Sequence, residues 1–172
     1  NINYTNLCYF RCGFCGFSKG PKSLNLRGAP YMLTVDEVVD RSVEAWDLGA
    51  SEVCLQGGIH PEYAGDFYVE VLSSIKARLP QMHVHGFTAL EVWQGAETLG
   101  VSVRDLLTRL RDAGLGTLPG TAAEVLDDRI RVHRDQRQSS RDLLRLDEAR
   151  RNAFQPDWSA YTPPIPKLPG RH

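Results

Sequence analysis

The sequence has little excess charge of either sign, few cysteines and no long apolar run. Its 172 residues carry 20 Lys and Arg against 21 Asp and Glu, a net charge of -1. This balance argues against binding to nucleic acid or to a membrane surface, because either needs a cationic excess. No apolar stretch approaches the ~20 residues of a membrane span, and no charged-then-apolar leader is present. Four cysteines are also too few for a disulfide scaffold of this length.

Glycine becomes scarce in the last quarter of the chain, where proline and basic residues gather. Residues 1–128 hold 10 Lys and Arg against 16 Asp and Glu, whereas residues 129–172 hold 10 against 5. We expect a folded domain over residues 1–131 and a divergent, basic, Pro-ended and poorly ordered tail over residues 132–172. So abrupt a change suggests a frameshift or a mis-joined segment. The first residue is Asn rather than Met, which suggests a piece of a longer protein.

Alternating and helically spaced apolar residues follow one another in a regular order. We predict strands over residues 2–5, 52–55, 82–87 and 115–118. We predict helices that are capped by Thr34, closed by Pro80, capped by Ser102 and opened by Thr121.

The resulting order, βαβαβαβα, predicts an α/β fold in which helices cover a parallel sheet. A complete (βα)8 barrel takes ~250 residues, so residues 1–131 supply about four βα units of a partial TIM-type barrel. Such a half-barrel leaves apolar faces and a sheet edge exposed. We therefore expect the chain as written to be catalytically weak or inactive by itself.

Three of the cysteines lie close together, directly after the first predicted strand. Cys8, Cys12 and Cys15 have the spacing CxxxCxxC, in a loop rich in glycine and aromatic residues. Closely spaced thiolates suit an iron–sulfur cluster or zinc in a reducing compartment, and we expect the cytoplasm. With three ligands, a four-iron cluster keeps one iron open for a substrate group. The alternative is a non-enzymatic module with a structural zinc, whose fourth ligand would be Cys54 or His60.

The cysteine motif resembles that of the radical S-adenosylmethionine (SAM) superfamily, including the aromatic Phe14 before its last cysteine. Four separated segments also occur in the order found in the CofH-type half of FO synthase. They are residues 1–6, 54–61, 83–87 and 118–124. The resemblance covers residues 1–131, and it is specific because several separated motifs agree.

This resemblance implies a cofactor site. In the superfamily the three cysteines hold a four-iron four-sulfur cluster, the open iron binds SAM, and one electron cleaves SAM to a 5′-deoxyadenosyl radical. By position, Gln56, Gly57 and Gly58 would contact the methionine end of SAM. Glu124 would accept hydrogen bonds from the ribose or amino group, and Phe14 would lie against the adenine. The alternatives are an ordinary strand-ending glycine turn and, for Glu124, a carboxylate in the first turn of a helix.

The resemblance also implies substrates and partners. The substrates would be L-tyrosine and 5-amino-6-(D-ribitylamino)uracil, and the transfer of the 4-hydroxybenzyl group would serve FO biosynthesis. The partners would be a CofG-type half or subunit and an electron donor such as ferredoxin or flavodoxin. A close alternative is aminofutalosine synthase or dehypoxanthine futalosine cyclase of menaquinone synthesis.

Three histidines are candidates for contact with these substrates. His83 and His85 are two apart on one predicted strand and therefore share a face. They contact a substrate if that face is the barrel interior, and otherwise they are ordinary hydrogen-bonded residues. His60 either contacts a substrate or shapes the turn before a proline. We predict that Cys54, mid-strand between apolar residues, is a small core residue.

Overall fold

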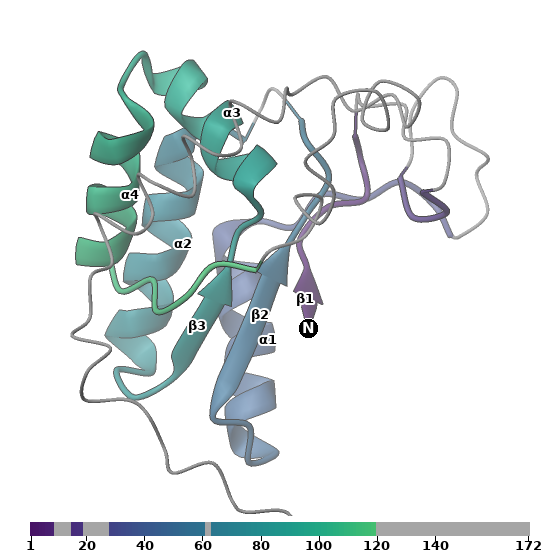
Figure 1. Ribbon diagram of the computed structural model, residues 1–172. Coiled ribbons are helices and arrows are strands. Elements are labelled where there is room, and N and C mark those ends of the chain that lie inside the picture. Colours follow the sequence, from purple (N-terminus) through teal and green to yellow (C-terminus); the bar gives the residue numbers. More distant parts are fainter. Residues whose placement is uncertain (9–14, 19–27, 61–62, 120–172) are drawn as a thin grey trace, which may run out of the picture.

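A computed structural model describes residues 1–8, 15–18, 28–60 and 63–119, which form a parallel sheet covered by helices (Figure 1). The strands pair side by side in the order β1-β2-β3. They are β1 (Ile2–Asn3), β2 (Glu52–Gln56) and β3 (His83–Gly86). The helices in the described part are α1 (Val35–Asp47), α2 (Gly65–Arg78), α3 (Ala89–Leu99) and α4 (Val103–Asp112). The predicted α/β class with parallel strands is confirmed.

The predicted helix ends are formed by local hydrogen bonds. The main-chain N–H of Glu37 donates to the Thr34 hydroxyl at 3.3 Å, and the Thr34 N–H donates back to the Glu37 carboxylate at 2.8 Å. At the start of α4, the hydroxyl of Ser102 accepts from the N–H of Asp105 at 3.1 Å. Each cap satisfies N–H groups that have no partner within the first helical turn. Helix α2 ends at Arg78, two residues before Pro80, because a proline disfavours helical geometry in the residue that precedes it.

Two elements between β3 and the end of the described part differ from the prediction. Helix α3 was not expected; it starts at a second capping box, formed by Thr88 and Glu91. The predicted strand over residues 115–118 is wrong in extent, because its pairing is one parallel bridge between Thr117 and His85. The helix predicted from Thr121 and the tail lie outside the described residues.

The helices lie on one side of the sheet, behind it and to its left in Figure 1. Val53, Leu55 and Val84 point toward them and are buried in a core with the apolar residues of α1, α2 and α4. Because side chains alternate across a strand, the intervening residues lie on the opposite surface. This surface, called the polar face below, consists of Asn3, Glu52, Cys54, Gln56, His83 and His85, all half-buried or exposed.

The position of Cys54 corrects the sequence prediction. Its neighbours Val53 and Leu55 occupy the core side of β2, so the alternation places Cys54 on the polar face, where it is half-buried. Its register partner there is His85 on β3. The prediction of a core residue is therefore wrong, because the apolar neighbours of Cys54 reflect burial of the other face.

Candidate cofactor site

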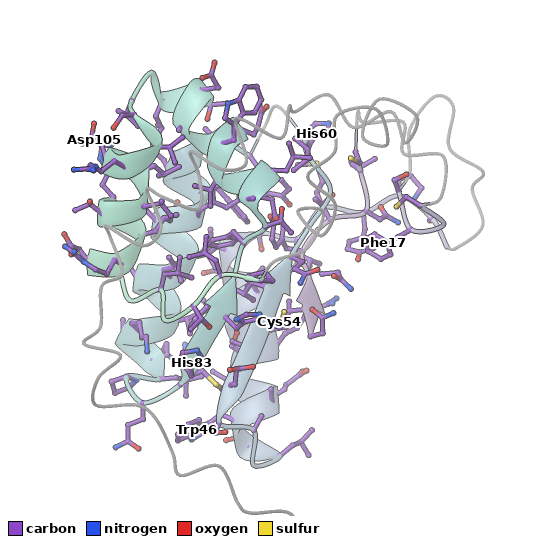
Figure 2. All side chains as sticks on the ribbon, viewed as in Figure 1. Phe17, Trp46, Cys54, His60, His83 and Asp105 are labelled. Carbon is purple, nitrogen blue, oxygen red and sulfur yellow. The ribbon has the colours of Figure 1, made fainter. Side chains whose placement is uncertain are left out.

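Cys8, the Gly57-Gly58 turn and His60 follow the carboxyl ends of β1 and β2, and these strand ends point to the top of Figure 1. Cys8 and Cys15 are half-buried, and Figure 2 labels Phe17 and His60 in the upper region of the view. The other predicted site residues Cys12, Phe14 and Glu124 lie outside the described residues. Within residues 1–8, 15–18, 28–60 and 63–119, no three His, Cys, Asp or Glu side chains form a metal-binding group.

The segment that leads into the cysteine loop is held firmly by its own polar side chains. Asn6 is buried, and its side-chain amide donates to the carbonyl of Ala29 at 3.0 Å and accepts from the N–H of Tyr31 at 2.9 Å. The hydroxyl of Thr5, also buried, donates to the carbonyl of Tyr31 at 2.8 Å. These bonds join the chain that enters the loop to the chain that returns from it. The two arms of the cysteine loop are therefore held side by side.

The Gly57-Gly58 turn packs directly against this entering arm. The N–H of Gly58 donates to the carbonyl of Thr5 at 2.9 Å. A Cβ atom at Gly58 would lie only 2.0 Å from the carbonyl oxygen of Leu7 and 3.0 Å from the Cβ of Cys8. Only glycine fits so close a backbone approach. The predicted SAM turn therefore adjoins the first cysteine of the motif.

A buried carboxylate lies behind the turn, on the core side. Glu91 is fully buried, and its Oε1 accepts hydrogen bonds from the Tyr4 hydroxyl and, at 3.0 Å, from the N–H of Gly57. Its Oε2 accepts from the N–H of Thr88 at 2.7 Å. Burial raises the pKa of Glu91 to about 7, although these hydrogen bonds lower it. Burial, followed by the charge of Glu91, raises the pKa of Tyr4 well above its usual value.

Sequence reasoning missed Glu91, Tyr4, Asn6 and Thr117 as parts of the site. For Glu91 a signal existed, because the pattern Thr-x-x-Glu at residues 88–91 is a capping box like that of α1. The pattern predicts the helix start but not the burial of the carboxylate. The other residues had no comparable local signal.

On the polar face, one hydroxyl joins the two predicted histidines. The Oγ1 of Thr117 lies 2.9 Å from Nε2 of His83 and 2.6 Å from Nδ1 of His85. A hydroxyl has one proton, so it can donate to only one of the two rings. It can accept from the other ring only if that ring's facing nitrogen carries a proton. Thr117 thereby links the tautomer of one ring to the tautomer of the other.

The residues of the polar face lie at different distances along the strands from the cysteine loop. His83 pairs in register with Glu52 at the amino ends of the strands, where its Nε2 lies 3.6 Å from the Glu52 carboxylate. His85 lies closer to the carboxyl ends. Gln56, at the end of β2, donates from Nε2 to the Cys54 sulfur at 3.5 Å. Figure 2 labels His83 well below His60 in this view. Of the three candidate histidines, His83 is therefore farthest along the strands from the cysteine loop.

Solved structures share this fold. Methylornithine synthase matches with a TM-score of 0.66 at 17% identity, over 88% of this chain and 40% of that chain. HydG, a maturase of the FeFe-hydrogenase, matches with a TM-score of 0.60 at 16% identity, over 89% of this chain and 32% of that one. This chain therefore shares part of the fold of these two proteins.

The sequence matches the Radical SAM superfamily over residues 2–166, and the chain belongs to this superfamily. Over 131 residues it is 47% identical to the FO synthase of Streptomyces avermitilis and 48% identical to that of Mycobacterium tuberculosis. It is 45% identical to the 5-amino-6-(D-ribitylamino)uracil–L-tyrosine 4-hydroxyphenyl transferase of Methanopyrus kandleri. The resemblance to the CofH-type enzymes is thus confirmed. Each match covers 76% of this chain, which spans 15% of the two synthases and 34% of the transferase.

No helix in the described part of the chain is both long enough and apolar enough to cross a bilayer.

Proposed function

We propose that this chain forms the cluster-binding and SAM-binding part of a radical SAM transferase. Cys8, Cys12 and Cys15 would hold a four-iron four-sulfur cluster. When bound, such a cluster supplies the electron that cleaves SAM and so starts the radical reaction. The observation that carries the proposal is the backbone of Gly58, which packs so closely on Leu7 and Cys8 that only glycine fits. This packing sets main chain without a side chain directly beside the first cysteine.

The SAM-binding residues would follow the first, second and fourth predicted strands. The main chain of Gly57 and Gly58 would approach the methionine amino group, and Gln56 would add a side-chain contact. Phe14 would cover the adenine, and Glu124 would accept from the ribose or amino group. The close packing of the glycine turn on the cysteine loop supports the first of these assignments.

For the reaction, we infer the transfer of the 4-hydroxybenzyl group of L-tyrosine to 5-amino-6-(D-ribitylamino)uracil. The support is the 45% identity to the relative whose name states these two compounds. His85 and His60 would contact substrate near the carboxyl ends, and His83 would do so deeper along the polar face. A CofG-type half and an electron donor such as ferredoxin or flavodoxin would complete the system, in the cytoplasm.

The cluster assignment is tested by anaerobic reconstitution of the full chain with iron and sulfide. Replacing Cys8, Cys12 and Cys15 together by Ala should abolish the brown absorbance and the bound iron. Cys54→Ala is the matched control, because this cysteine lies on the polar face beside Gln56, and it should retain both. Retention of iron and absorbance by the triple variant would refute the assignment.

The substrate assignment needs a separate assay. The reconstituted chain is supplied with SAM, a reductant, L-tyrosine and the uracil acceptor, and product is followed by mass spectrometry. We expect weak turnover or none from this chain by itself. A longer relative of the same family, assayed in its place under the same conditions, should form the product. A product from futalosine-pathway substrates instead would favour the menaquinone enzymes.

A further inference from the structure

The two capping boxes of this chain have the same local pattern but different surroundings. In the first, Glu37 is solvent-exposed and bonds to Thr34, its own helix cap. In the second, Glu91 is fully buried and also reaches Gly57, 34 residues earlier in the chain. A capping role needs no burial, so the cap alone does not account for the position of Glu91.

Three donors converge on the Glu91 carboxylate from three different elements. Tyr4 donates from the end of β1, Gly57 from the turn after β2, and Thr88 from the start of α3. The ring of Tyr4 fills the space where a side chain at Gly57 would lie, 2.3 Å from the ideal Cβ position. Hydrogen bonds from neutral donors to a carboxylate are stronger than those between neutral groups. The carboxylate therefore ties the turn to β1 and α3 at a single point.

These bonds fix the orientation of the turn. The N–H of Gly57 points inward to Glu91, and the N–H of Gly58 points to the carbonyl of Thr5. In a trans peptide the carbonyl points opposite to the N–H of the following residue. Anchoring the N–H of Gly58 therefore directs the Gly57 carbonyl away from the loop arm. A carbonyl is the group that accepts hydrogen bonds from an ammonium.

We propose that Glu91 is a positioning residue, which holds the Gly57-Gly58 turn beside the cysteine loop in the orientation that accepts the methionine end of SAM. The inference rests on the proposed function, since it takes SAM as the ligand of the turn. Glu91 acts through Gly57 and does not touch the ligand. Tyr4 supports it by donating to the same carboxylate oxygen and by packing under Gly57.

The test compares Glu91→Ala with Glu37→Ala, which removes the same residue from the other capping box. In the metal-free chain, Gly57 amide exchange is measured by NMR; in the reconstituted chain, SAM affinity is measured by equilibrium dialysis. Glu91→Ala should accelerate Gly57 exchange and raise the SAM dissociation constant, each by about tenfold, the equivalent of one lost hydrogen bond. Glu37→Ala should leave both within about twofold of the unmodified chain, because its carboxylate is exposed.

Glu91→Gln provides a second variant that keeps the shape of the side chain. Its amide retains one acceptor oxygen, so exchange and affinity should fall between those of Glu91→Ala and the unmodified chain. This variant carries the test if Glu91→Ala does not fold. Gly57 exchange and SAM affinity that match those of Glu37→Ala in both Glu91 variants would overturn the proposal.

The two proposals fail in different ways. If the unmodified chain holds a cluster but binds no SAM, the proposed function is wrong. The Gly57 exchange rate still decides the positioning role in that case: faster exchange in the Glu91 variants supports it, and unchanged exchange refutes it.

Discussion

The main-chain N–H of Gly57 and the carboxylate of Glu91 lie 3.0 Å apart inside the protein, although 34 residues separate them in sequence. This contact joins the turn after β2 to the first turn of α3. Through this contact, a residue of the helical layer bonds directly to the main chain of the candidate cofactor site. Changes in Glu91 should therefore affect both stability and the site.

Glu91 gives the stability of the chain a pH dependence of unusual sign for a carboxylate. Burial raises its pKa in the folded chain from 4.5 to about 7. The folded chain then holds a proton that the unfolded chain releases between these values, so this group's contribution to stability falls as pH rises through that window. The loss amounts to about 3 kcal/mol. Urea unfolding from pH 4.5 to 7.5 should show a smaller decline for Glu91→Gln than for the unmodified chain.

Glu37 is the control for that experiment. Hydrogen bonds from Thr34 lower the pKa of Glu37, so its contribution is present above its unfolded pKa and is lost as pH falls. Glu37→Gln should leave the decline between pH 4.5 and 7.5 unchanged. An identical decline in the Glu91 variant would mean that the buried carboxyl does not titrate in this range.

Replacing Gly58 by Ala should disrupt the junction of turn and cysteine loop. The new Cβ would lie 2.0 Å from the main-chain oxygen of Leu7, and a backbone atom cannot move aside as the end of a flexible side chain can. We expect a loss of about 2–3 kcal/mol in the free energy of unfolding, measured by urea titration, together with weaker binding of iron on reconstitution.

Gly86→Ala is the matched control for the glycine variant. Its Cβ would meet the Cβ of Leu55 at 3.3 Å, a far milder contact in the same sheet. It should cost less than Gly58→Ala and leave iron binding intact. Equal effects of the two substitutions would show that the turn has no special need for glycine.

Removing the hydroxyl of Thr117 should uncouple the two histidines of the polar face. In Thr117→Val the hydrogen bonds to His83 and His85 are lost, at about 1 kcal/mol each. Nitrogen NMR should then report changed proton positions on both imidazole rings. Thr108→Val, which removes a hydroxyl that donates to the Arg104 carbonyl in α4, should leave these spectra unchanged. Ring signals unaltered by Thr117→Val would contradict the coupling.

The sequence predicted those features that depend on short-range patterns. Thr34 and Ser102 cap their helices as expected, and the strand order follows from alternating segments. The side of the sheet on which Cys54 lies was not predictable from its apolar neighbours, because register and helix packing decide which face is buried.

The long-range contacts of the site were likewise beyond the sequence. Residues 88–91 contain a recognisable cap, but only the tertiary fold brings Glu91, at the start of α3, to Gly57 after β2. The meeting of Thr117 with His85 depends on a parallel bridge between segments 32 residues apart. Neither contact leaves a local pattern in the chain.

Metal and sulfide analysis of the anaerobically reconstituted chain, followed by titration with SAM, tests the cofactor assignment most directly. Three cysteine ligands with one open iron predict about four iron and four sulfide ions per chain, and an electron paramagnetic resonance signal of the reduced cluster that changes when SAM binds. About one zinc per chain without sulfide would contradict it and identify the cysteine loop as a structural metal site.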